Sequence, residues 1–139
     1  MKTTTEIIVR YAETDQMGIV HHSVYAVWFE AARTEFGKSI GMSYAECENK
    51  GLMLPLIGLE CKFISPAHYG DTVIIEAWVE KMTPVRMTVA YNVKKKEKGT
   101  LLATGKTSHA WTNSNRRPVN LKKANPEVYK AYFGAMEQQ

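Results

Sequence analysis

The sequence predicts an α+β fold in which a curved antiparallel sheet of about five strands wraps a long central helix. Three observations lead to this prediction: an apolar repeat of helical period covers residues 23–40, one strand pattern precedes it, and alternating strand patterns fill most of residues 54–112. One helix cannot cover both faces of such a sheet. We therefore expect a second subunit to close the remaining face or edge.

Length and composition indicate one globular domain covering residues 1–139. A chain of 139 residues can bury a real hydrophobic core, and its 45% hydrophobic and 23% charged residues are typical of globular proteins. No apolar run approaches the ~20 residues that span a bilayer, so no membrane span is expected. The segment Met1–Glu6 carries an acid and lacks the apolar core of a secretory signal, which predicts a cytoplasmic protein.

The net charge indicates the kind of partner, and the cysteine spacing indicates which covalent or metal links are expected. The net charge is +4 and the isoelectric point about 9.0, which favours an anionic partner. The basic runs are not interleaved with aromatic residues, so no nucleic acid is expected and a phosphorylated small molecule fits better. Cys47 and Cys61 lie far apart and form no CxxC pair, so neither a disulfide-stapled fold nor a structural zinc site is expected.

The first predicted element is a strand over Thr3–Tyr11. Ile7, Val9 and Tyr11 occupy one face of this strand, and the intervening residues occupy the other. A loop over residues 12–22 then connects the strand to the helix.

The central helix is predicted from Ser23 to about Ile40. Ser23 is the expected N-cap and Gly41 the expected C-terminal stop. At 1.5 Å per residue such a helix is roughly 27 Å long, the span of a small domain. Polar residues such as Arg33 fall away from its apolar stripe. The stripe recurs at three- and four-residue steps and consists of Tyr25, Trp28, Phe29, Ala32, Phe36 and Ile40.

The remainder of the chain is predicted to be nearly all strand. A loop or short helix is expected over residues 44–51, and a tail from Asn113 is expected to end in a short helix starting near Pro126. Pro55 and Gly58 interrupt the first of the intervening strands. These strands are expected over residues 54–64, 72–80, 86–94 and 101–112, with turns at residues 65–71 and 97–100.

The segment that joins the first strand to the helix carries the residues that point to chemistry. Residues 11–25 place a carboxylate, a glycine, two histidines and a tyrosine close to a helix start. The first turn of a helix has unpaired backbone N–H groups and a partial positive charge, so it can bind an anion or a polarised carbonyl. An acid beside such a group is what acyl-transfer chemistry needs. The sequence therefore predicts an active-site loop here.

Three motifs resemble hotdog-fold acyl-CoA thioesterases of the 4-hydroxybenzoyl-CoA thioesterase type, and the resemblance covers nearly the whole chain. The segment Asp15–Tyr25 resembles the family signature of Asp, two residues, Gly, two apolar residues, then His or Asn, with a Tyr at the helix start. Pro66–Asp71 resembles the turn after the second strand, and Arg116–Val119 resembles the Arg-Pro element after the last strand. The resemblance implies a hotdog fold and a thioesterase that hydrolyses acyl-CoA to a carboxylic acid and CoA without a cofactor.

The resemblance also implies roles for the loop residues. Asp15 is the catalytic carboxylate, as nucleophile or general base, and the main-chain N–H of His22 polarises the thioester carbonyl. Gly18 lets the loop backbone pass close to the thioester. Tyr25 is a candidate catalytic residue whose alternative role is core packing. His21 is expected to line the pocket, and no metal is expected because no third histidine lies at ligand spacing.

Coenzyme A carries phosphates, which call for Lys or Arg near the pocket mouth. By resemblance Arg116 and Arg117 are the first candidates for these contacts, and Lys62 is a further one. The resemblance places the active site at a subunit interface and implies a homodimer or homotetramer.

Several alternatives remain open from the sequence. Asp15 after Thr14 also suits an Asx-turn. Glu30 is the reserve catalytic carboxylate, and its alternative role is an ion pair within the helix. His109 is expected to be a strand residue without chemistry. Other functions on the same scaffold are an acyl-carrier-protein thioesterase, a hydratase or dehydratase, and a non-enzymatic acyl-CoA binding protein; the acyl group itself is not predicted.

Overall fold

The helical repeat forms the long helix α1 (Val24–Ser39) in a computed structural model that describes residues 1–137. The residues predicted to form its apolar stripe are buried, apart from the half-buried Ile40. Gly41 follows the helix with φ +73°, and its N–H donates to the carbonyl of Lys38. This left-handed turn closes the helix, so the predicted stop at Gly41 is confirmed.

The prediction that Ser23 caps α1 with its side chain is wrong. Ser23 precedes the helix, but its backbone is already helical and its hydroxyl accepts no hydrogen bond from the first turn. The hydroxyl instead lies 2.8 Å from Nδ1 of His21. Because the Ser23 hydroxyl is engaged by His21, it does not cap the helix. The N–H groups in the first turn of α1 therefore donate no hydrogen bond to the serine oxygen.

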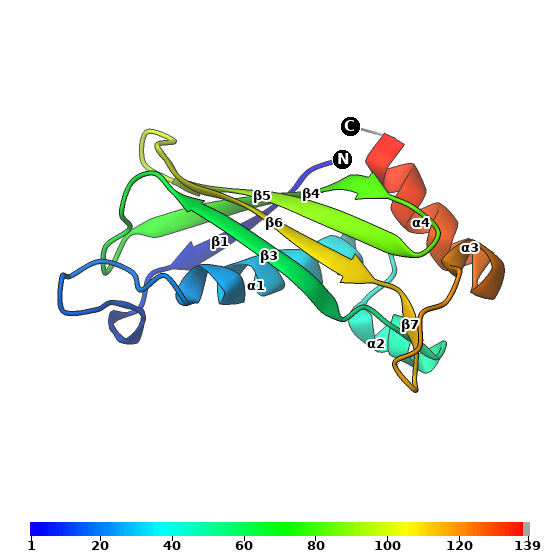
Figure 1. The fold of residues 1–139 in the computed structure, drawn as a ribbon. Helices are drawn as coiled ribbons and strands as arrows, with labels where there is room; N and C mark the ends of the chain where they lie inside the picture. Colours follow the sequence, from blue (N-terminus) through cyan, green and yellow to red (C-terminus); the bar gives the residue numbers. More distant parts are fainter. Residues whose placement is uncertain (138–139) are drawn as a thin grey trace.

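Five strands form one antiparallel sheet in the order β1-β4-β5-β6-β3, with α1 against one face (Figure 1). The predicted α+β architecture of a sheet around a central helix is therefore confirmed. A bulge between Leu56 and Gly58 coincides with the interruption expected in the second strand of the sequence. The strands are β1 (Thr3–Ile8), β3 (Leu56–Phe63), β4 (Thr72–Met82), β5 (Arg86–Lys95) and β6 (Leu101–Ala110).

The inner face of the sheet forms the core with α1. The ring of Phe29 in α1 stacks on Tyr91 of β5, with centroids 4.3 Å apart. Gly105 of β6 lies beneath the same ring, and a Cβ atom there would collide with it. The alternating residues of the two central strands complete the buried face, as the sequence predicts: Val73, Ile75, Ala77 and Val79 in β4, and Met87, Val89, Tyr91 and Val93 in β5.

The first strand is shorter than predicted. β1 ends at Ile8, and Tyr11 begins a 3₁₀ turn, η1 (Tyr11–Glu13), in which its side chain is 77% exposed. The prediction that Tyr11 belongs to the strand and shares one face with Ile7 and Val9 is therefore wrong. The carboxylate of Glu13 accepts the N–H of Arg10 at 2.8 Å, and this bond turns the chain out of the strand direction.

Arg33 also departs from the expectation that it falls away from the buried stripe. Its guanidinium is half-buried and donates to the hydroxyls of Tyr44 and Tyr91, both at 3.2 Å. The Tyr91 hydroxyl lies 2.6 Å from Thr107 Oγ1, which lies 2.8 Å from Nε2 of the buried His109. A polar chain thus runs from α1 through the core to β6.

Smaller elements close the end of the core near the C-terminus of α1. Tyr132 of the last helix packs edge-on against Trp111, and its hydroxyl donates to the carbonyl of Met42 at 3.2 Å. The longest helix has 16 residues, and within residues 1–137 no helix combines the length and apolar character needed to cross a bilayer. The smaller elements are α2 (Tyr44–Asn49), β2 (Leu52–Met53), β7 (Thr112–Asn113), α3 (Leu121–Ala124) and α4 (Pro126–Glu137).

Candidate active site

A cavity of about 320 Å³ lies where the loop of residues 12–22, the amino end of α1 and the end of β3 meet. Among residues 1–137, Asp15 is the only carboxylate that lines it, and the other polar groups are His22, Ser65 and the phenol of Tyr25. The rest of the lining is apolar. Its apolar residues are Met17, Ile19, Val20, Phe63, Ile64 and Pro66.

Asp15 is held in a tight turn in which one carboxylate oxygen has no hydrogen-bond donor among residues 1–137. Its Oδ1 accepts the N–H of Met17 at 2.8 Å, and its carbonyl accepts the N–H of Gly18 at 3.0 Å. The Asx-turn considered from the sequence is therefore present, and the same residue also lines the cavity. A carboxylate fixed through one oxygen can still offer the other to a ligand.

Gly18 serves the turn rather than a close approach within this chain. Its φ of +78° is a conformation that other residues adopt at a cost, while no atom lies within 4 Å of the position where a Cβ would be. The expected contact of its backbone with a substrate stays a prediction.

The helix start presents a free donor beside the cavity. The main-chain N–H of His22 has no hydrogen-bond acceptor within the described part of the chain, whereas its neighbour His21 donates its N–H to the carbonyl of Glu13 at 2.9 Å. The two imidazole rings lie against each other at a tilt of 33° with centroids 4.1 Å apart, and of the two only His22 lines the cavity. The expectation that the His21 side chain lines the pocket is wrong, because its Nδ1 is bound to Ser23.

Tyr25 forms the aromatic wall of the cavity. The side chain is buried, and its ring packs against Trp28 and edge-on against Phe63 at 5.1 Å. Burial raises the pKa of its phenol, with a further increase from Cys61 and an opposing backbone hydrogen bond at Ala67. The phenol therefore stays neutral at physiological pH, which suits packing and hydrogen-bond donation rather than proton abstraction.

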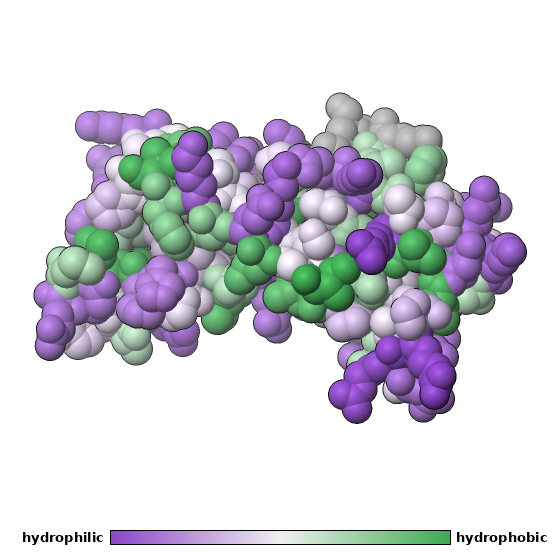
Figure 2. Space-filling model, in the orientation of Figure 1, coloured by the Kyte–Doolittle hydropathy of each residue, from purple (hydrophilic) through white to green (hydrophobic). Residues whose placement is uncertain are grey.

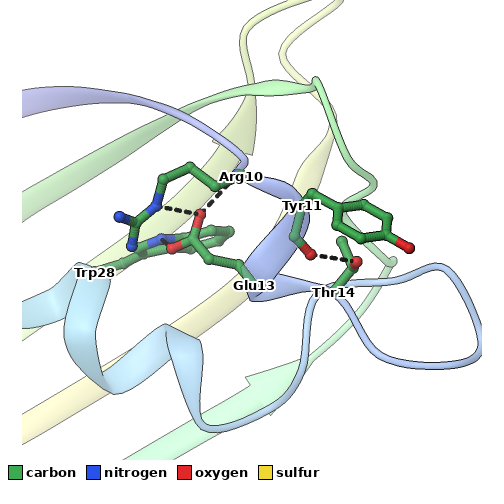
Figure 3. A network of polar contacts seen from close by, with 5 residues as sticks. All are labelled: Arg10, Tyr11, Glu13, Thr14 and Trp28. Atoms are coloured by element: carbon green, nitrogen blue, oxygen red, sulfur yellow. Dashed lines mark hydrogen bonds and ion pairs between the residues drawn. The ribbon is translucent and has the colours of Figure 1, made fainter.

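The sequence did not single out Glu13, which the structure places at the base of the loop. Its carboxylate accepts the N–H of Arg10 at 2.8 Å and the indole N–H of Trp28 at 3.1 Å (Figure 3). In the sequence, only its position two residues before Asp15 could have indicated that Glu13 belongs to the site. Glu13 is therefore a second carboxylate of the same loop, and its oxygens bind the protein scaffold.

The remaining candidates are not brought to this cavity within one chain. Lys62 lines a separate depression of about 480 Å³ on the outer face of the sheet, and Arg116 lines another of about 230 Å³ beside Trp111. Arg117 is exposed in the turn after β7, at the opposite end of the molecule from the Asp15 loop (Figure 1). Glu30 is exposed on α1 and does not line the cavity. The ion pair within the helix, which was the alternative role of Glu30, is absent from residues 1–137, and the neighbouring Arg33 turns inward.

Comparison with known proteins identifies relatives over most of the chain. The thioesterase superfamily matches residues 17–103. A Bacillus subtilis protein named "Putative acyl-CoA thioesterase YneP" is 36% identical over 128 residues, which are 91% of this chain and 92% of that protein. The chloroplastic acyl-acyl carrier protein thioesterase ATL3 of Arabidopsis thaliana is 30% identical over 116 residues, which are 84% of this chain and 61% of that protein.

Solved structures agree with the architecture. A DHNA-CoA thioesterase from Staphylococcus aureus has a TM-score of 0.90 and 35% identity, with 96% of this chain and 89% of that chain covered. The hypothetical protein TT1821 from Thermus thermophilus has a TM-score of 0.88 and 36% identity, with 95% and 98% covered. These likenesses confirm the hotdog fold that the sequence motifs implied.

Proposed function

The chain belongs to the thioesterase superfamily, and from this premise we propose that it hydrolyses acyl-CoA to a carboxylic acid and free CoA at the Asp15 cavity. The chain is a thioester hydrolase on a hotdog scaffold. One observation supports the proposal: the Asp15 carboxylate and the His22 main-chain N–H, which has no acceptor in the described part of the chain, belong to residues that line the same apolar cavity.

The His22 N–H is suited to the charge that develops in thioester cleavage. When the carbonyl carbon becomes tetrahedral, its oxygen gains negative charge, and a preorganised N–H aimed at it contributes about 3–4 kcal/mol. The partial positive charge at the amino end of α1 acts in the same direction. The apolar walls, which include Phe63 and Tyr25, would hold the acyl group.

Asp15 begins the reaction on either of two routes. As a nucleophile, its free oxygen bonds to the carbonyl carbon, the CoA thiolate leaves, and water hydrolyses the resulting mixed anhydride. As a general base, it takes a proton from a water molecule whose oxygen attacks the carbonyl carbon. Each route consumes one water and yields a carboxylic acid and CoA. The Met17 N–H orients the carboxylate in both.

A second copy of the chain would complete the site. β3 is an edge strand, and on its inner face Leu59 and Phe63 are 49% and 53% exposed. Hydrophobic side chains follow the course of β3 across the face shown in Figure 2. A long apolar edge strand needs a cover, and pairing β3 with its own copy provides one.

This pairing also accounts for the position of the arginines. A two-fold axis through the middle of β3 exchanges the two ends of the molecule, so the β7 turn of one protomer approaches the Asp15 loop of the other. Arg116, whose φ of +62° marks a tight turn, and Arg117 would then lie near the mouth of the partner's cavity. Guanidinium groups at this point suit the phosphates of CoA.

The decisive experiment measures thiol release from aryl and straight-chain acyl-CoA thioesters by the parent enzyme and by Asp15→Asn. The amide cannot attack or accept a proton, so we expect a loss of at least about two orders of magnitude in kcat with an unchanged circular dichroism spectrum. The same acyl groups on acyl carrier protein, assayed in parallel, identify the preferred carrier.

Glu30→Gln is the matched control, because Glu30 is an exposed carboxylate of α1 outside the cavity. This variant should keep the parent rate. An Asp15→Asn enzyme as active as its parent would overturn the proposal, and an inactive Glu30→Gln enzyme would move the chemistry to Glu30.

A further inference from the structure

We propose that Glu13 is the positioning residue of the active-site loop, whose buried carboxylate sets the separation between the Asp15 carboxylate and the His22 N–H. The inference rests on the proposed function, since both groups flank the same cavity. Asp15 lies on the outgoing arm of the loop and His22 on the arm that returns to α1. Catalytic groups carried on two arms must be held within about half an ångström of the productive geometry.

The Glu13 side chain ties the end of β1 to α1. It is only 7% exposed, and each oxygen has its own donor: Oε1 accepts the N–H of Arg10 at 2.8 Å, and Oε2 accepts the indole N–H of Trp28 at 3.1 Å. The Arg10 guanidinium lies 3.5 Å from Oε1 on the exposed side (Figure 3). Only a carboxylate offers two acceptor oxygens and no donor to these two N–H groups.

The Glu13 main chain ties the two arms of the loop to each other. Its carbonyl accepts the N–H of His21 at 2.9 Å, and its N–H donates to the carbonyl of Arg10 at 3.0 Å. Because His21 precedes His22 directly, the bond to His21 sets the plane in which the next amide points. One residue therefore fixes the outgoing arm, the returning arm and the helix.

Trp28 makes this anchor rigid. It is fully buried in the core, one turn into α1, and its ring packs against that of Tyr25 at 5.0 Å. The indole N–H is thus a fixed point of the scaffold rather than part of the loop. Burial of a carboxylate costs free energy unless both oxygens accept hydrogen bonds. A buried carboxylate therefore contributes little net stability, but it holds its hydrogen-bond donors in a fixed geometry.

Glu13→Gln tests the proposal with little change of volume. The amide keeps one acceptor and places an NH₂ group against either the Arg10 N–H or the Trp28 N–H, so one of the two bonds is lost. We expect kcat to fall at least about tenfold while KM changes less than about twofold, since the apolar walls remain. Amide hydrogen exchange should rise over residues 10–22 and stay unchanged in the sheet.

Glu76→Gln is the control for the loss of a carboxylate that accepts hydrogen bonds from two donors away from the cavity. Glu76 on β4 also accepts from two donors, Asn92 Nδ2 at 3.1 Å and Lys94 Nζ at 3.0 Å, but it does not line the cavity. The Glu76→Gln variant should lower Tm about as much as Glu13→Gln does. Its kcat and its amide exchange over residues 10–22 should equal those of the parent. Equal falls of kcat in both variants would mean that Glu13 acts only through stability and would overturn the proposal.

A second variant separates the anchor from the chemistry. Trp28→Phe removes the same hydrogen bond from the other side, so Glu13→Gln combined with Trp28→Phe should be scarcely slower than the worse single variant. Independent, additive losses of kcat would overturn the coupling.

The exchange measurement does not depend on catalysis: unchanged amide exchange in Glu13→Gln overturns the proposed role of Glu13 even if Asp15→Asn is inactive. Conversely, a fully active Asp15→Asn removes the proposed function while the exchange still reports on the anchor.

Discussion

His109 is a residue whose protonation state is decided by burial. Its imidazole is buried beside Thr107, and desolvation together with the nearby Arg33 guanidinium lowers its pKa to about 4. In the unfolded chain a histidine has a pKa near 6.5. Above pH 6.5 both states are neutral, so His109 adds no pH dependence there; as the pH falls from 6.5 to 4, the unfolded state takes up the proton first and stability is lost.

We therefore expect acid sensitivity that depends on this one side chain. Between pH 7.5 and pH 5 the parent should lose about 2 kcal/mol more free energy of unfolding than His109→Gln, because the difference corresponds to roughly 1.5 pH units at 1.36 kcal/mol each. Urea unfolding at the two pH values measures this directly. Parallel pH profiles for parent and variant would show that His109 is protonated to the same extent in both states.

The Asx-turn of Asp15 is compatible with its predicted catalytic role. The sequence left open an Asx-turn or a catalytic acid, and the structure contains the turn and the cavity together. The Met17 N–H occupies one oxygen and leaves the other free. The turn is therefore the means by which the carboxylate is aimed.

At the scale of elements, the fit of α1 on the sheet depends on one missing side chain. The Phe29 ring stacks on Tyr91 at 4.3 Å and covers the bare backbone of Gly105. The carbonyl of Glu60 lies 3.0 Å from the other side of the position that a Cβ would take. α1 can lie this close to the sheet because β6 carries a glycine at the contact.

Gly105→Ala should consequently destabilise the protein by about 1–3 kcal/mol, the usual cost of overpacking a core. The ring cannot yield easily, since it is fully buried and held between Tyr91 and the helix. Urea denaturation provides the measurement. Gly134→Ala in α4, where open space surrounds the added methyl group, should be neutral or stabilising by up to about 1 kcal/mol. Equal stability of Gly105→Ala and the parent would contradict this packing argument.

At the scale of the whole molecule, the charges on β3 predict a register for the proposed pairing with a second copy. On the outer face of this strand Glu60 and Lys62 flank Cys61. A two-fold axis through Cys61 sets each Glu60 opposite the partner's Lys62, whereas an axis through Glu60 sets two carboxylates opposite each other. Opposite charges in facing positions stabilise an antiparallel pair, and like charges destabilise it.

This register predicts a specific cross-link. Facing residues of an antiparallel pair have Cα atoms roughly 4.5–5.5 Å apart, within the range that a disulfide bridges. Oxidation with copper phenanthroline at alkaline pH should therefore give a covalent dimer through Cys61; burial raises the pKa of this thiol, so the reaction needs the higher pH. Cys61→Ser should abolish the dimer, and Cys47→Ser, which removes a buried thiol of α2, should not. A monomer by light scattering would rule out the interface.

The sequence by itself was enough to predict the order of the long helix and the five sheet strands, and the place of the loop that lines the Asp15 cavity. Both follow from local patterns: the stripe from Tyr25 to Phe36, the alternation in β4 and β5, and an acid close to a helix start. Neighbouring residues carry these signals, so no tertiary contact is needed to detect them.

The contacts of Glu13, Arg33 and His109 become visible only in the folded molecule. Glu13 meets Trp28 from 15 residues away, and Arg33 meets Tyr91 from 58 residues away. Periodicity classifies such residues as polar and therefore exposed. They become buried because folding brings hydrogen-bond partners to them, and burial of a polar group depends on partners that local sequence does not specify.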